Sequence, residues 1–119
     1  MWIKSSAELS ENLYQVTTEV SSHFLVWGNE AGIVDASVTA THQRLEEEIT
    51  RFIGGGHNLK YLFLTHADFD HIGGIPALRK FAPEIEVVAS PQIVQRLSDK
   101  GFLEEAYDKN LACAQAMNR

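Results

Sequence analysis

The sequence predicts one α/β domain in which helices pack against a mixed β-sheet. Short runs rich in apolar, β-branched and aromatic residues recur along the chain, which is typical of strands. The first three runs are separated only by turn residues, whereas the later ones alternate with segments of helical periodicity. This order predicts an antiparallel meander that continues into β–α units.

The expected strands carry few polar residues on either side, and that pattern favours a sheet covered on both faces. We place these strands at residues 12–20, 23–27, 33–35, 59–64 and 85–89.

The clearest expected helix has an apolar stripe of Leu45, Ile49, Phe52 and Ile53. Either Thr39 or Thr41 is expected to cap its start, and the glycines at 54–56 to end it. Further helices are expected at 75–81, after the capping pair Ser90-Pro91 up to Gly101, and across the tail 102–119.

Composition narrows the class of protein. The 119 residues suit a single globular domain, and a net charge of −6 argues against a nucleic-acid partner. The single cysteine, Cys113, has no internal partner for a disulfide. No run approaches the roughly 20 apolar residues of a membrane span, and residues 1–6 lack the apolar core of a signal peptide. We therefore expect a cytoplasmic protein with no membrane or nucleic-acid partner.

The segment 65–74 is the predicted metal-binding segment, because four side chains able to bind metal lie within six residues. These are His66, Asp68, Asp70 and His71. A mixed set of imidazoles and carboxylates favours zinc, iron or manganese over calcium or magnesium. Two neighbouring metal ions could activate a water molecule for hydrolysis, with Asp70 as a ligand that also accepts its proton.

Other ionisable residues near this segment have less specific interpretations. His23 lies in an apolar run and is expected in the core, whereas His42 and His57 are expected to face solvent. Asp35 ends the third expected strand, where it could orient a metal ligand or serve a turn.

The run Thr65-His66-Ala67-Asp68-Phe69-Asp70-His71-Ile72-Gly73-Gly74 resembles the signature loop of the metallo-β-lactamase-fold superfamily, T-H-x-H-x-D-H-x-G-G. The segments 32–35 and 87–91 resemble strands that flank that loop, and the resemblance covers most of residues 12–100. It implies an αββα sandwich that binds one or two metal ions, commonly zinc and in some branches iron or manganese. It also implies that His66 binds the first metal, and Asp70 and His71 the second.

The chain departs from the family pattern in two ways. Asp68 replaces the usual second histidine, which resembles the flavodiiron branch with its glutamate at this place. No histidine follows His71, although the family has later ligands in the second half of the sandwich. We therefore expect residues 1–119 to form the N-terminal half of the sandwich, truncated or completed by self-association, with an apolar sheet face to cover.

Three functions remain open from the sequence. The first is a metal-dependent hydrolase of small esters, lactones, thioesters or phosphoesters. The second, suggested by Asp68, is a di-iron redox or oxygen-binding protein. The third is a non-catalytic half-domain that acts in assembly or binding, suggested by the absence of the later ligands.

Overall fold

A computed structural model describes residues 5–118. Residues 1–4 and Arg119 lie outside the described residues, and part of the signal-peptide expectation concerns residues 1–4. Six strands form one sheet in the order β1-β2-β3-β4-β5-β6. Pairing is antiparallel from β1 to β4 and parallel from β4 to β6. The mixed sheet is thus confirmed, with β1 as an additional strand. The strands are β1 Ala7–Ser10, β2 Leu13–Thr17, β3 Ser22–Trp27, β4 Ala31–Val34, β5 Leu59–Phe63 and β6 Glu86–Val88.

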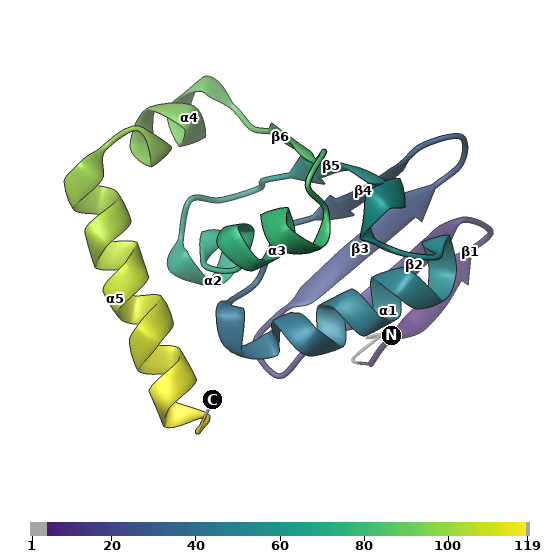
Figure 1. Cartoon of the computed structure of the whole chain (residues 1–119), viewed down its shortest axis with the longest axis horizontal. Coiled ribbons are helices and arrows are strands. Elements are labelled where there is room, and N and C mark those ends of the chain that lie inside the picture. The colour runs from purple at the N-terminus through teal and green to yellow at the C-terminus, as the bar shows by residue number, and fades with distance from the viewer. Residues whose placement is uncertain (1–4, 119) are drawn as a thin grey trace.

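Helices α1, α2 and α3 lie on one face of this sheet, and α4 and α5 stand beside it (Figure 1). The parallel strands require such crossover connections, which α1 and α3 provide. The α-helices are α1 His42–Ile53, α2 Phe69–Ile72, α3 Ile75–Phe81, α4 Pro91–Leu97 and α5 Lys100–Ala116, and short 3₁₀ turns occupy Thr39–Thr41 and Gly56–Asn58.

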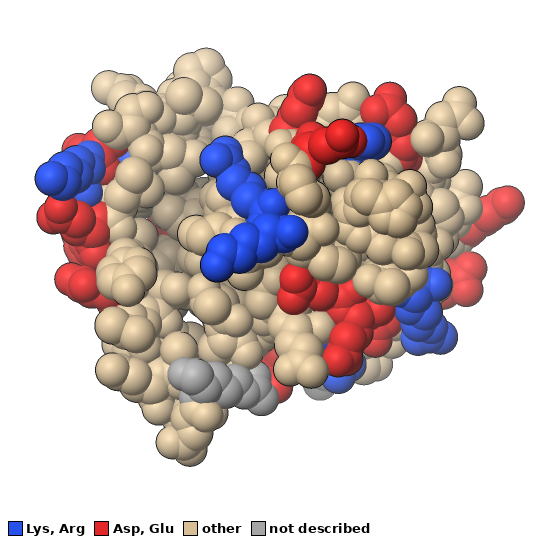
Figure 2. All heavy atoms as spheres, in the orientation of Figure 1, with Lys and Arg blue, Asp and Glu red and all other residues tan. Residues whose placement is uncertain are grey.

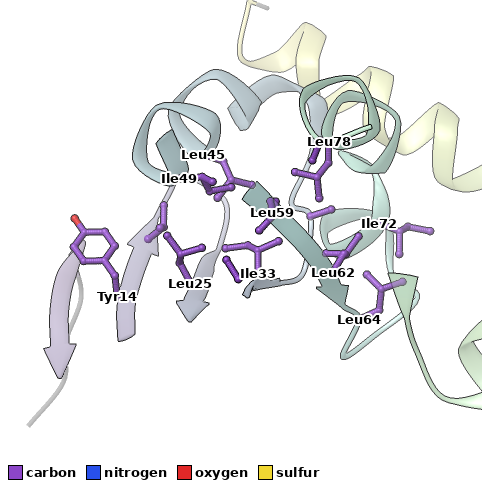
Figure 3. Packing of buried hydrophobic residues seen from close by; sticks show 14 of the residues in the cluster. Tyr14, Leu25, Ile33, Leu45, Ile49, Leu59, Leu62, Leu64, Ile72 and Leu78 are labelled. Carbon is purple, nitrogen blue, oxygen red and sulfur yellow. The ribbon is translucent and has the colours of Figure 1, made fainter. Parts of the chain in front are cut away.

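The hydrophobic core fills the space between the helices and the sheet (Figure 3). From α1, the fully buried Leu45 and Ile49 point toward the strands. Leu25, Ile33 and Leu62 meet them from the sheet. The apolar stripe read from the sequence is therefore the face that α1 buries.

The opposite face of the sheet is open, which corrects the expectation that both faces are covered. Side chains alternate between the two faces along a strand. In β3, His23 and Leu25 are buried, whereas Phe24 and Val26 are 40% and 44% exposed. The sequence predicted two covered faces because the side chains of β3 that face outward, Phe24 and Val26, are apolar as well.

Apolar side chains on neighbouring strands extend this open face. Val26 pairs with Leu13 on β2, Phe63 pairs with Val34 on β4, and Phe63 also pairs with Val88 on β6. Phe63 and Val88 are 36% and 44% exposed. We use "open face" below for Leu13, Phe24, Val26, Val34, Phe63 and Val88.

Helix ends match the sequence in part. Gly54 ends α1 with a φ of 86°, and the Ser90 hydroxyl accepts a hydrogen bond from the Ile93 amide at the start of α4. The expected threonine cap is wrong, because Thr41 makes no capping hydrogen bond and Thr39 donates elsewhere. Gly101 does not end α4, since it lies inside α5.

Helix α5 begins earlier than expected because Asp99 caps it, with its carboxylate accepting from the Phe102 amide. Among residues 5–118, no helix is long and apolar enough to cross a membrane.

Candidate metal centre

The predicted metal-binding loop lies at the edge of the sheet where the parallel strands β4 and β5 both end. The register pairs Val34 with Phe63, so the chain leaves both strands at the same level. The Asp35 amide continues the ladder by donating to the Phe63 carbonyl at 2.8 Å. Loop residues 35–38 and 64–68 therefore leave the sheet side by side, as sites in open α/β sheets commonly do.

Asp35 is the buried centre of this edge, with only 5% of its surface exposed. One carboxylate oxygen accepts from the Thr65 amide at 2.8 Å. The other accepts from the Thr65 hydroxyl at 2.5 Å and from Nδ1 of His71 at 2.8 Å. Asp35 therefore orients His71, which is one of the predicted ligands.

These bonds set the proton positions on both imidazoles. An ionised carboxylate only accepts, so His71 presents Nδ1–H to Asp35. The Thr65 hydroxyl donates its single proton to Asp35. It therefore accepts from Nδ1 of His66, 3.0 Å away. In the neutral form of each ring, Nε2 is then the unprotonated nitrogen, which is the atom that can bind a metal. The ring centroids lie 4.9 Å apart.

The two other predicted ligands flank this pair. Asp70 on α2 has an oxygen 3.7 Å from Nε2 of His71, and its side chain is 37% exposed. Asp68 is exposed at the N-terminus of α2 and makes no capping hydrogen bond with its side chain. Its backbone carbonyl accepts from the His71 and Ile72 amides, which starts the single turn that carries Asp70 and His71.

The donor chemistry fits one side of a metal site. Two imidazoles with unprotonated Nε2 atoms and a nearby carboxylate suit zinc or iron. Within residues 5–118, however, no three His, Cys, Asp or Glu side chains lie close enough together to hold an ion. The described residues thus bring the predicted ligands to one edge of the sheet without completing a coordination shell.

Asp35 and Ser37 have left-handed backbone conformations, with φ values of 62° and 58°. Residues other than glycine rarely adopt this conformation, which costs roughly 1–2 kcal/mol. Buried His23 supports this segment, because its Nδ1 lies 2.9 Å and 3.0 Å from the Val34 and Asp35 carbonyl oxygens. Its Nε2 accepts from the Ser21 hydroxyl at 2.8 Å. His23 is therefore in the core, as the sequence predicts.

Burial lowers the pKa of His23, against the opposing effect of its hydrogen bonds to the Val34 and Asp35 carbonyls. A neutral ring with Nδ1–H directed at the two carbonyls follows from this environment.

His42 is buried, which corrects the expectation that it faces solvent. Its Nδ1 lies 3.4 Å from a Glu46 oxygen, and its ring packs under Gly74, where an added Cβ would come within 2.8 Å of the ring. Burial lowers its pKa, while Glu46 acts in the opposite direction. The sequence signal was available, because residue 42 precedes Leu45 and Ile49 at helical spacing.

Backbone hydrogen bonds join the two loops of the site. The Ala36 amide donates to the His71 carbonyl at 2.8 Å, and the Gly74 amide donates to the Ser37 carbonyl at 2.9 Å. Glycine is needed at 74, since a side chain there would overlap the Ala36 carbonyl. These contacts fix the turn that follows His71 against the segment that follows Asp35.

Helix α5 also reaches the site, through a residue that the sequence did not indicate. Both the oxygen and the nitrogen of the Asn110 side-chain amide form hydrogen bonds with Thr39. The Thr39 hydroxyl in turn donates to the Gly73 carbonyl at 3.2 Å. Asn110 and Thr39 are 71 residues apart. No local pattern pairs two such residues, and only the tertiary structure reveals the contact.

Comparison with protein families gives a match over residues 16–111 to the family described as the metallo-β-lactamase superfamily. A putative diflavin flavoprotein A 3 from Nostoc sp. is 32% identical over 98 residues, which are 82% of this chain and 17% of that protein. A putative diflavin flavoprotein A 2 from Synechocystis sp. is 29% identical over 99 residues, 81% of this chain and 16% of that protein.

Among solved structures, a metallo-β-lactamase from Cronobacter sakazakii with a HARLDQ motif superposes with a TM-score of 0.70 at 23% identity. The match covers 82% of this chain and 38% of that one. The chain therefore spans less than a fifth of its curated relatives and less than half of this structural neighbour.

Proposed function

The chain belongs to the metallo-β-lactamase superfamily, and on that premise we propose that it carries the N-terminal ligands of a metal-dependent hydrolase. His66, Asp68, Asp70 and His71 are the proposed metal ligands. The observation that supports this most directly is the hydrogen-bond network of Asp35, which contacts Nδ1 of His71 directly and Nδ1 of His66 through Thr65 and so leaves Nε2 of each ring as the nitrogen for a metal. Zinc or iron is the proposed cofactor.

A bound divalent metal would supply Lewis acidity and lower the pKa of a coordinated water. The protein contributes the orientation of the ligands, because Asp35 fixes both rings from a buried position. Asp70 is the proposed catalytic carboxylate, since it lies beside Nε2 of His71 and is exposed enough to contact a water molecule. The proposed substrate is a small ester, lactone, thioester or phosphoester.

Metal titration tests the ligand set. We expect purified chain to bind Zn²⁺ or Fe²⁺ in calorimetry, and His66→Ala and His71→Ala to lose most of that affinity. His57→Ala is the matched control, because His57 is exposed and lies outside this loop. Equal affinity of the two site variants and the control would reject the ligand assignment. Hydrolysis of ester, lactone and phosphodiester probes by metal-loaded protein, lost in Asp70→Asn, would support the reaction class.

A di-iron redox or oxygen-binding role is the second candidate. Two observations favour it: an acidic residue at 68, and relatives named as putative diflavin flavoproteins. Carboxylates suit harder and more oxidised metal ions than imidazoles do. Anaerobic iron loading followed by optical and Mössbauer spectra distinguishes the two roles, because coupled iron signals support the redox role and exclusive zinc occupancy rejects it.

We also propose that the open face is covered in the working protein, either by a second copy of the chain or by further polypeptide. Exposed Phe24, Val26 and Val88 support this, since contiguous apolar patches on soluble proteins commonly mark interfaces. The covering layer is the proposed source of the ligands that the described residues lack.

A further inference from the structure

Helix α5 contacts α2 and the 3₁₀ turn Thr39–Thr41 beside the candidate metal centre. Two hollows lie along the face of α5 that is turned to the body, one of about 570 Å³ toward the start of the helix and one of about 750 Å³ toward its end. Thr39, Tyr107 and Asn110 border both. Figure 2 shows hollowed surface between the outlying helices and the body. The contact between these hollows includes Asn110, which is half-buried.

The hydrogen bonds at this contact have a defined direction. The Thr39 amide donates to Oδ1 of Asn110 at 3.0 Å, and Nδ2 of Asn110 donates to the Thr39 hydroxyl at 2.9 Å. That hydroxyl has one proton, which it directs to the Gly73 carbonyl at 3.2 Å. Asn110 thus selects the orientation in which Thr39 donates to the loop.

Gly73 packs directly on the same amide. A Cβ at residue 73 would come within 2.6 Å of Oδ1 of Asn110 and 2.7 Å of the Phe69 carbonyl oxygen. Gly73 follows immediately after α2, the single turn that carries Asp70 and His71. The Gly73 amide closes that turn by donating to the Phe69 carbonyl at 2.7 Å.

We infer that Asn110 is a positioning residue for the candidate metal centre: through Thr39 it holds the end of α2 and thereby the direction of Asp70 and His71. This inference rests on the proposed function, in which those two residues bind metal. Asp35 holds the His71 side chain, while the Asn110–Thr39 pair holds the backbone that follows it. A short single-turn helix has little stability of its own, so such external contacts determine its placement.

The test is a double-mutant cycle on Zn²⁺ affinity, measured by calorimetry on the full chain. We expect Asn110→Ala and Thr39→Val each to weaken binding about tenfold, as for other residues that orient metal ligands. Because both act through the same hydroxyl, the double variant should also lose about tenfold, not a hundredfold. Thr39→Ser keeps the hydroxyl and should retain wild-type affinity, and Gln115→Ala removes an exposed amide from the same helix as the control.

Amide hydrogen exchange in the metal-free protein gives a second readout. Asn110→Ala should speed exchange at Gly73 and Gly74, while amides in the core strand β5 and the overall unfolding midpoint change much less. Losses of affinity that add in the double variant, or unchanged exchange at both glycines, would overturn the inference. If wild-type protein binds no Zn²⁺, the proposed function fails, and the exchange measurement alone supports or overturns the positioning role.

Discussion

Asp35 shows how one buried side chain can orient two proposed ligands on a separate segment. Its two oxygens accept three hydrogen bonds from Thr65 and His71, and Thr65 extends the effect to His66. The left-handed conformation at Asp35 is part of this arrangement, since strained backbone is commonly found at functional sites. Proton placement, and not only distance, decides whether these imidazoles can bind metal.

Asp35→Asn is expected to reverse the proton position on His71. An amide NH₂ facing Nδ1 would donate to it, so the ring proton would move to Nε2 and block the metal-binding atom. We expect about a 10–100-fold loss of Zn²⁺ affinity. Nitrogen NMR reports the tautomer and calorimetry the affinity, with the exposed Asp108→Asn as control. An unchanged His71 tautomer would contradict this reading of the contacts.

Acid is expected to destabilise the fold through His23 and His42. Burial lowers both pKa values in the folded state, so below the unfolded value of about 6.5 the unfolded chain binds more protons. The free energy of unfolding should therefore be greatest above pH 6.5 and fall as the pH drops below it. Urea midpoints from pH 7.5 to 5.0 measure this.

A variant can assign part of this pH dependence to His23. His23→Asn keeps an N–H donor near the Val34 carbonyl but has no group that titrates, so its midpoint should fall less steeply with acid. His57→Asn is the control, because His57 is exposed. Equal slopes for wild type and His23→Asn would exclude His23 as the source.

Helix α1 and the short helix α2 divide the work of the fold between the core and the site. Helix α1 buries Leu45 and Ile49 against the sheet, and its first residue, His42, packs under Gly74. Helix α2 is too short to be stable alone and is held by the loops and by α5. The long elements therefore carry stability, and the short one carries two of the four proposed ligands, Asp70 and His71.

Ile49→Ala should lower the free energy of unfolding by about 2–5 kcal/mol, because it leaves a cavity beneath α1 in a fully buried position. Thr50→Ala, on the exposed side of the same helix, should change it by less than about 0.5 kcal/mol. Urea unfolding measures both. Similar losses in the two variants would contradict the packing shown in Figure 3.

At the scale of the whole molecule, the helices of residues 5–118 cover one side of the six-stranded sheet and leave the other open. The open face presents apolar side chains from five strands, and several of them are more than a third exposed. Exposure of such a surface to water is unfavourable by roughly 25 cal/mol per Å² of apolar area. A second layer packed on this face would remove that cost.

We expect the isolated chain to associate in solution through this face. Val26→Lys places a charge in its centre and should shift light scattering toward the monomer, with little effect on stability because Val26 is 44% exposed. Tyr107→Lys makes the matched change at an exposed aromatic residue of α5. A monomeric wild type at high micromolar concentration would contradict self-association and leave further polypeptide as the proposed cover.

The sequence by itself determined the α/β class, the main strands and helices, and the loop with His66, Asp68, Asp70 and His71, because these depend on local periodicity, turn residues and spacing. Only the tertiary structure decided which sheet face is covered, that His42 is buried, and that Thr39 and Asn110 meet across 71 residues. It also decided the hydrogen bonds that hold Nδ1 of His71 on Asp35 and Nδ1 of His66 on Thr65. Such features depend on contacts between distant segments, and neither periodicity nor residue type encodes those contacts locally.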